Sequence, residues 1–230
     1  MPKYRHLILA TAGAMVLVLP ASAAYAASAH KAKPVLTVGK KGGPAVKKGA
    51  VLKASLAKKT TVSFALGSSF AATCKSSLLT AKVTANPSKP GKATLSVTAL
   101  SMTKCALNPA VSGVTLNGIT VLNRPYVATV SNSKRDPVTV AGSKTSKPLS
   151  LKASITVGTT PLTCVYTAKS ISGHASNTGN KVSFSKQSFA LDAGASGSLC
   201  TSAAATATFS ATYGPVKDTS VKGSPKVFVS

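Results

Sequence analysis

The stretch Leu52-Lys53-Ala54-Ser55 occurs a second time in this chain, as Leu151-Lys152-Ala153-Ser154. Each copy is followed by a cysteine, a run rich in Ser, Thr and Val, and a second cysteine. The repeat therefore predicts two versions of one small β unit, each closed by its own disulfide. The cysteines of the first and then the second unit are Cys74, Cys105, Cys164 and Cys200.

Short runs rich in Val, Thr, Ser and Leu continue along the chain, separated by Gly, Pro and Asn. Such runs between turn residues are typical of β-strands, and no segment has sustained helical periodicity. We also expect a tight hairpin at Asn117-Gly118, because this pair supplies the positive φ angles of a type I′ turn. The main strands expected are Thr61–Leu66, Leu79–Ala85, Ala93–Leu100, Leu149–Val157, Leu162–Ala168, Val182–Phe189, Ala203–Tyr213 and Lys226–Val229.

Units of roughly 90–100 residues with many short strands have the size of immunoglobulin-like sandwiches. The predicted fold class is therefore all-β, with two tandem immunoglobulin-like β-sandwich units that carry one disulfide each. The expected boundaries are a signal peptide at 1–26, a basic arm at 27–50, β-sandwich unit 1 at 51–131, a linker at 132–148 and β-sandwich unit 2 at 149–230.

The start of the chain has the order of a secretory signal. Lys3 and Arg5 precede an apolar run, Leu7–Leu19, and Ala24-Tyr25-Ala26 fits an A-x-A cleavage site. The apolar run is too short for a stable membrane anchor. We therefore expect general secretion with cleavage near Ala26, an extracellular protein, and no transmembrane segment after signal removal; a retained anchor is the alternative.

In an exported protein, cysteines are expected to pair, and four cysteines allow three connectivities. We favour Cys74–Cys105 and Cys164–Cys200, because the repeat places one pair in each unit. Loops of about thirty residues predict a stabilisation of roughly 3–4 kcal/mol from each bond. A zinc site is not expected, since the chain has no C-x-x-C and His174 is the one histidine in the expected folded region.

The charge of the chain is strongly one-sided. It has 28 Lys+Arg and 3 Asp+Glu, which gives a formal net charge of +25. Such a field attracts polyanions and is weakened by salt. Because lysine suits diffuse attraction better than bidentate recognition, nucleic acid is expected to bind only non-specifically. The alternative is that dispersed lysines simply keep an exported protein soluble.

Lysines are densest near the start of the expected mature chain, where no acid occurs. We read Val35–Val38 as a short strand and Lys40–Lys48 as a mobile turn. The expected partner is an anionic cell-wall polymer or an acidic protein. The predicted polyanion-binding residues are Lys40, Lys41, Lys47, Lys48, Lys58 and Lys59. Two alternatives are a solvated leader and an adaptor subunit of a secreted complex, whose arm adds a strand to a partner sheet.

Catalysis requires carboxylates, histidines or activated thiols in proximity, and this chain has few. Asp136, Asp192 and Asp218 all lie beside turn residues. His174 and Asp192 formally permit a Ser-His-Asp triad. The S-x-x-K spacing of penicillin-recognising enzymes occurs without S-D-N or K-T-G. We expect no enzyme activity, no cofactor and no metal.

From Cys74 to Cys105 the chain reads Cys…T-A-x-V-T-A-N-P…P-G-x-A-T-x-S-x-T-A…Cys. With the signal peptide and the second half, this pattern resembles a group of small secreted proteins from actinobacteria such as Streptomyces. The resemblance covers most of the mature chain, implies a secreted β-rich protein with paired cysteines, and supplies no catalytic residue. The high lysine content departs from the group, so a shared partner is not implied. The predicted function is a non-catalytic binding or structural module at or outside the cell surface.

Overall fold

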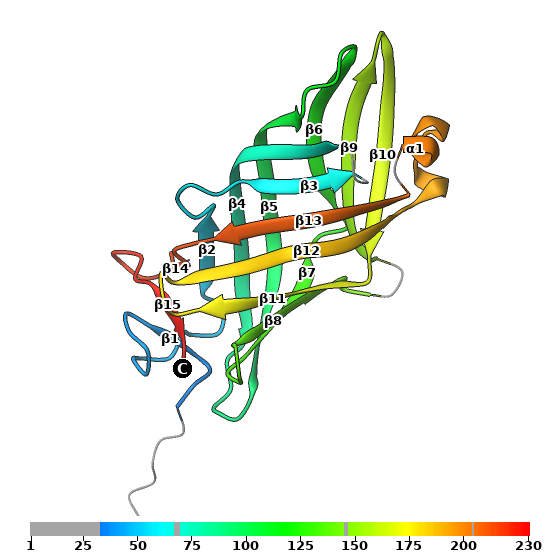
Figure 1. The fold of residues 1–230 in the computed structure, drawn as a ribbon. Helices are drawn as coiled ribbons and strands as arrows, with labels where there is room; N and C mark the ends of the chain where they lie inside the picture. Colours follow the sequence, from blue (N-terminus) through cyan, green and yellow to red (C-terminus); the bar gives the residue numbers. More distant parts are fainter. Residues whose placement is uncertain (1–32, 67–69, 145–146, 204) are drawn as a thin grey trace, which may run out of the picture. The chain divides into compact units, whose positions relative to one another are not determined.

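Two long antiparallel strands, β4 (Phe70–Ala85) and β5 (Lys92–Asn108), connect the parts of this fold (Figure 1). The structure is a computed structural model that describes residues 33–66, 70–144, 147–203 and 205–230. The predicted strands Leu79–Ala85 and Ala93–Leu100 lie inside β4 and β5, which both extend to the first cysteine pair. The predicted signal peptide at 1–26 lies outside the described residues.

Eight antiparallel strands close into a barrel-like ring. Its order is β11-β8-β7-β5-β4-β3-β13-β12, and β12 pairs back to β11. Because the ring is closed, each of its strands is paired along both edges, whereas an open sheet always leaves two edge strands with unpaired backbone groups. Besides β4 and β5, the ring contains β3 (Val62–Leu66), β7 (Tyr126–Ser131), β8 (Pro137–Ala141), β11 (Ser170–Ser176), β12 (Lys181–Leu191) and β13 (Thr206–Tyr213).

Further strands extend from this ring. The path continues from β12 to β10 (Thr160–Ala168), β9 (Leu149–Val157) and β6 (Val114–Leu122). On β4, β2 (Val51–Ser55) adds a strand and pairs in turn with β14 (Lys217–Asp218). The short strands β1 (Leu36–Val38) and β15 (Val227–Val229) pair with each other in a separate sheet.

The protein is nearly all β, as predicted, but two tandem immunoglobulin-like sandwiches are not confirmed. Residues 32–230 form one compact unit. The sheet mixes the predicted units, since Phe64 on β3 lies opposite Phe209 on β13. The predicted linker at 132–148 contains β8, which pairs with β7 on one side and β11 on the other. Strands pair within each half, but pairings such as β3–β13 and β6–β9 also join the halves to each other and make them one fold.

The hairpin predicted at Asn117-Gly118 is wrong. Strand β6 runs straight through this pair and bonds to β9, with Leu116 opposite Ile155 and Gly118 opposite Ser154. Asn117 is therefore an extra residue, a β-bulge, whose amide bonds to Thr156 Oγ1 at 2.9 Å. A long partner strand in β9 supplies a continuous ladder, which outweighs the local preference of an Asn-Gly pair for a turn.

The basic arm predicted at 27–50 is also not a solvated extension in its described part. Val35, Leu36 and Val46 are buried, and β1 pairs with β15 near the C-terminus (Figure 1). The side chain of Asn86 accepts from Leu36 N–H and donates to Leu36 C=O, both at 2.8 Å. Apolar burial and these bonds fix the segment against the β4–β5 loop.

Aromatic side chains fill the interior where the two predicted halves meet. Phe64 makes edge contacts with Tyr166 and Phe189, at ring-centroid distances of 5.3 and 6.0 Å. Phe209 lies 6.5 Å from Phe189 and 6.4 Å from Phe184. Such pairs contribute beyond the area that they bury, so one aromatic cluster links β3, β10, β12 and β13.

Both predicted disulfides are confirmed. Cys74 on β4 lies directly opposite Cys105 on β5, so the first bond joins neighbouring strands. The second bond joins Cys164 on β10 to Cys200 on the short helix α1 (Ser198–Ala203). A 3-10 turn, η1 (Ala193–Ala195), precedes this helix. A helix was not predicted here.

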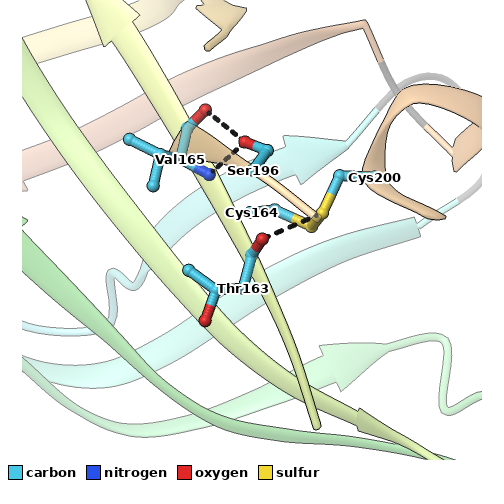
Figure 2. Close-up of a disulfide and its surroundings, with 5 residues drawn as sticks. All are labelled: Thr163, Cys164, Val165, Ser196 and Cys200. Carbon is cyan, nitrogen blue, oxygen red and sulfur yellow. Dashed lines mark hydrogen bonds between the residues drawn. A yellow bond between two sulfur atoms is a disulfide. The ribbon is translucent and has the colours of Figure 1, made fainter. Parts of the chain in front are cut away.

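Figure 2 shows how β10 holds the segment before α1. The Val165 N–H donates to Ser196 Oγ at 2.9 Å, and that hydroxyl donates back to Val165 C=O at 3.3 Å. Cys200 Sγ lies 3.1 Å from the Thr163 carbonyl oxygen. The disulfide therefore reinforces contacts that the backbone of β10 already makes.

Within the described ranges, no helix is long and apolar enough to cross a membrane.

Candidate functional site

Three exposed lysines lie opposite one another on the outer face beside β2. Lys53 on β2 pairs with Lys217 on β14, which in turn bridges to Lys226. Residues directly opposite in an antiparallel pair project to the same face. Lys82 on β4 is the diagonal neighbour of Lys53, since Lys53 lies opposite Thr80. We call Lys53, Lys82, Lys217 and Lys226 the β2 lysine row.

This arrangement is unfavourable for the isolated fold. Like charges directly opposite in a sheet are destabilising, by up to about 1 kcal/mol for each pair. Neighbouring strands are about 4.8 Å apart, so the three opposed positions span about 10 Å, close to one Debye length at physiological salt. An anionic segment lying across β2 would therefore meet these charges together.

The described acids do not offset the row. Asp218 is next to Lys217 in sequence but is buried, and its Oδ1 accepts from Ser220 N–H at 2.9 Å. Asp136 lies near Lys41 and Lys89 instead. Burial raises the pKa of the Asp136 carboxyl above its ordinary value, while the charges of these two lysines act in the opposite direction. The β2 face is thus left strongly cationic.

The six predicted lysines fall into three separate turns, and all six are exposed. Lys40 and Lys41 follow Gly39, whose N–H donates to the Lys226 carbonyl at 2.8 Å, so this turn adjoins the row. Lys47 and Lys48 precede Gly49, whose Cβ position would lie 4.0 Å from the Lys82 side chain.

The third predicted pair lies at the opposite end of β2. Lys58 and Lys59 form the turn after this strand, where Ala57 N–H donates to the Thr212 carbonyl of β13. The structure therefore brings four of the six predicted lysines to the β2 lysine row. The third pair is placed beyond the row along the strand.

The members of the row itself were missed by sequence reasoning. Lys53 is the lysine of the repeated Leu-Lys-Ala-Ser stretch, and the alternation of Leu52, Lys53 and Ala54 does indicate that Lys53 faces outward. Lys217 and Lys226 carry no such signal. They reach Lys53 only through the pairing of strands that are 164 residues apart in sequence.

Strand addition to a partner is the alternative role of the arm, but in its described part the backbone groups of the predicted strand are already hydrogen-bonded. The predicted strand Val35–Val38 corresponds to β1, which pairs with β15 on one side. On its other side, Leu36 is bonded to the Asn86 side chain, and Val46 N–H donates to the Leu36 carbonyl at 3.0 Å. Pairing with a partner sheet would require these bonds to break.

The one catalytic triad that the sequence permits is not assembled. His174 lies on β11 opposite Ser183 of β12. Asp192 follows Ser183 by nine residues along the same strand direction, a distance of about 30 Å in an extended chain. Its Oδ1 accepts from Ala195 N–H at 3.2 Å, which caps η1.

Strands of the ring, together with β1, β2, β6, β9 and β15, also line a partly open cavity of about 140 Å³. Most of its border is apolar, with contributions from Leu52, Val97 and Phe184, and one buried amide, Asn180, belongs to it. A second hollow of about 260 Å³ lies among β6, β9 and β10, with exposed Val157 and Leu199 at its border.

The fold and the site define this chain as a disulfide-linked, all-β protein with a cationic outer face and an apolar interior cavity. Comparison with protein-family models, with curated proteins and with solved structures gave no match.

Proposed function

We propose that this protein is a secreted, non-catalytic binding module that attaches to anionic polymers at or outside the cell surface. The observation that carries the proposal is the opposition of Lys53, Lys217 and Lys226 across neighbouring strands. A solubility device requires only dispersed charge. Lysines placed face to face cost free energy in the isolated protein, and a bound polyanion removes that cost.

The kind of ligand follows from the kind of cation. Lysine is a flexible point charge that gives strong but non-directional attraction, whereas arginine supplies bidentate geometry. All members of the β2 lysine row are lysines, and so are the residues of the adjoining turns at 40–41 and 47–48. We infer a flexible polymer with repeated negative charges, bound without sequence or stereochemical selectivity, such as an anionic cell-wall polymer.

Secretion is part of the same proposal. Two disulfides suit an oxidising compartment outside the cytosol. The predicted signal at 1–26, with cleavage near Ala26, supplies the route. Mass spectrometry of the protein recovered from culture medium tests this: a mature chain beginning at Ala27 is expected, and a chain that stays in the cytosol would contradict it.

The binding site is tested with two variants of equal charge. The row variant replaces Lys53, Lys217 and Lys226 with glutamine. The control variant replaces three exposed lysines outside the row, Lys75, Lys134 and Lys169, with glutamine as well. The formal charge of +25 therefore falls by three in both variants.

Retention on a heparin column separates the two explanations. We expect the row variant to elute at clearly lower salt than the control variant, which should elute close to the wild type. Equal elution of both variants would show that only total charge matters, and would leave the lysines as a solubility device.

A further inference from the structure

We propose that the second hollow, among β6, β9 and β10, binds a neutral apolar molecule with about the size of two fused six-membered rings. We call this hollow the β9 hollow. The proposal does not depend on polymer binding at the β2 lysine row. It rests on the apolar border of the hollow, on its volume, and on the exposed hydrophobic side chains around it.

One wall of the β9 hollow is a single face of the sheet that extends beyond the ring (Figure 1). Val114 of β6 lies opposite Val157 of β9, and Ile155 of β9 lies opposite Leu162 of β10. Directly opposed residues project to the same face, and so do residues two apart along a strand. These four side chains therefore form one continuous apolar surface, whereas Thr156 between them faces the other way.

The rest of the border comes from separate parts of the chain. It includes Leu66 at the end of β3, Leu107 on β5 and Leu199 on α1. The disulfide between Cys164 and Cys200 fixes α1 to β10 at this place (Figure 2), and Cys164 itself borders the hollow. These parts do not fill the space over the sheet face, and a volume of about 260 Å³ is left among them.

The border of the β9 hollow is itself exposed to solvent. Leu199 is 52 % exposed, and Val111 and Val157 are each 38 % exposed. Among the described residues six large hydrophobic side chains are exposed, and three of the six border this one hollow. Single exposed hydrophobic residues are normal, but a group of them marks a binding site. A ligand can therefore enter past these side chains.

The border also carries no charge. The chain has 28 Lys+Arg, yet none of the described residues that border the β9 hollow is charged. A charged ligand would lose hydration there without gaining an ion pair. Water is also a poor occupant, because a buried water requires two to four polar partners. The border therefore favours an uncharged, apolar ligand.

The volume of the hollow sets the size of the ligand. Protein interiors contain few voids larger than a water molecule. An engineered apolar cavity of about 150 Å³ in another protein binds benzene. The β9 hollow, at about 260 Å³, is nearly twice as large and matches two fused rings. Because its border is partly exposed, a further substituent can remain in solvent.

The probe for the test is N-phenyl-1-naphthylamine, a neutral molecule whose fluorescence rises in an apolar site. Its naphthyl group has the proposed size. The border variant carries Val157→Thr and Leu199→Asn, which place polar atoms at the hollow without changing the net charge. The control variant carries Val127→Thr and Leu78→Asn, the same changes at exposed positions that do not border the hollow.

We expect the probe to bind the wild type and the control variant with equal affinity. The dissociation constant of the border variant should be about tenfold higher, as for the loss of apolar contact with about two methyl groups. Equal affinity of all three proteins would overturn the proposal, and so would a wild type that does not raise the fluorescence of the probe.

A filling variant separates the volume of the hollow from its apolar character. Val114 is half-buried at the border, so Val114→Phe keeps the border apolar but takes up space. Probe binding should therefore weaken in this variant, whose folding is checked by circular dichroism. Undiminished binding to folded Val114→Phe would place the probe elsewhere and contradict the proposal.

Discussion

Asn86 and Asn177 hold the two paired chain segments in the same way. The Asn86 amide bonds to both N–H and C=O of Leu36, and the Asn177 amide bonds to both groups of Val229, at 2.9 and 2.7 Å. Leu36 and Val229 are themselves directly paired in β1 and β15. The small sheet made by the arm and the C-terminal strand is therefore bracketed by an asparagine on each side.

The first prediction concerns this bracket. Asn86 also donates to the Val46 carbonyl at 2.9 Å, so Asn86→Ala removes three hydrogen bonds and leaves part-buried backbone groups without partners. We expect the free energy of unfolding to fall by about 2 kcal/mol and the Leu36 amide to lose hydrogen-exchange protection. Asn117→Ala, which removes one exposed bond to Thr156, is the control and should change stability little. Full protection of Leu36 in Asn86→Ala would refute the bracket.

The second prediction concerns the disulfides. Their sequence separations are 31 and 36 residues, which gives roughly 4 kcal/mol for each in the chain-entropy model. The local effects of removing the two disulfides should differ, however. The strands joined by Cys74–Cys105 are held by a long backbone ladder, whereas α1 has only six residues and is too short to be stable alone.

Replacing Cys164 and Cys200 with alanine should therefore make the segment around α1 sensitive to protease, while the double alanine variant of Cys74 and Cys105 should leave it resistant. Limited proteolysis with mass mapping measures this. Equal cleavage around α1 in both variants would show that the second disulfide does not hold the helix.

The third prediction concerns alkaline pH. Tyr213 is 1 % exposed, and burial raises its pKa to about 12, while a hydrogen bond with Ser77 acts in the lowering direction. In the unfolded chain the pKa of tyrosine is near 10. The folded state thus holds the proton more tightly. This contribution is complete below pH 10 and is lost as the pH rises toward 12, by roughly 3 kcal/mol in total.

Urea unfolding between pH 8 and 12 tests the linkage against Tyr213→Phe, which has no proton to lose. The free energy of unfolding of the wild type minus that of the variant should be constant up to pH 10. Above pH 10 this difference should fall, because only the wild type loses the stabilisation from the Tyr213 proton. Because all the other titratable groups are the same in both proteins, the comparison isolates Tyr213. A difference that does not change with pH would contradict the assignment.

The sequence predicted the local parts of this fold well, because alternation and turn residues act over a few positions. Leu149–Val157 is strand β9 as expected, and Thr61–Leu66 contains β3. The cysteine pairs followed from the order of the repeat. The internal repeat itself stays a prediction.

Long-range pairing was not readable in the same way. Nothing near Phe64 indicates that β3 pairs with β13, because strand registry between distant segments is decided by the whole core. The turn predicted at Asn117-Gly118 was wrong for the same reason, since β9, the strand that pairs with this part of β6, is remote in sequence. The β2 lysine row also depends on such a pairing, and a charge count alone located only the turns beside it.

The central claim is that the β2 lysine row, rather than total charge, binds anionic polymers. Its most direct test is the slope of log K against log salt concentration for binding of single-stranded poly(dT), a flexible polyanion, to the row and control variants. Each phosphate contact contributes about −0.7 to that slope for a single strand. Loss of Lys53, Lys217 and Lys226 should therefore make the slope less steep by about 2, while the control variant keeps the slope of the wild type. Slopes that change equally in both variants would contradict the claim.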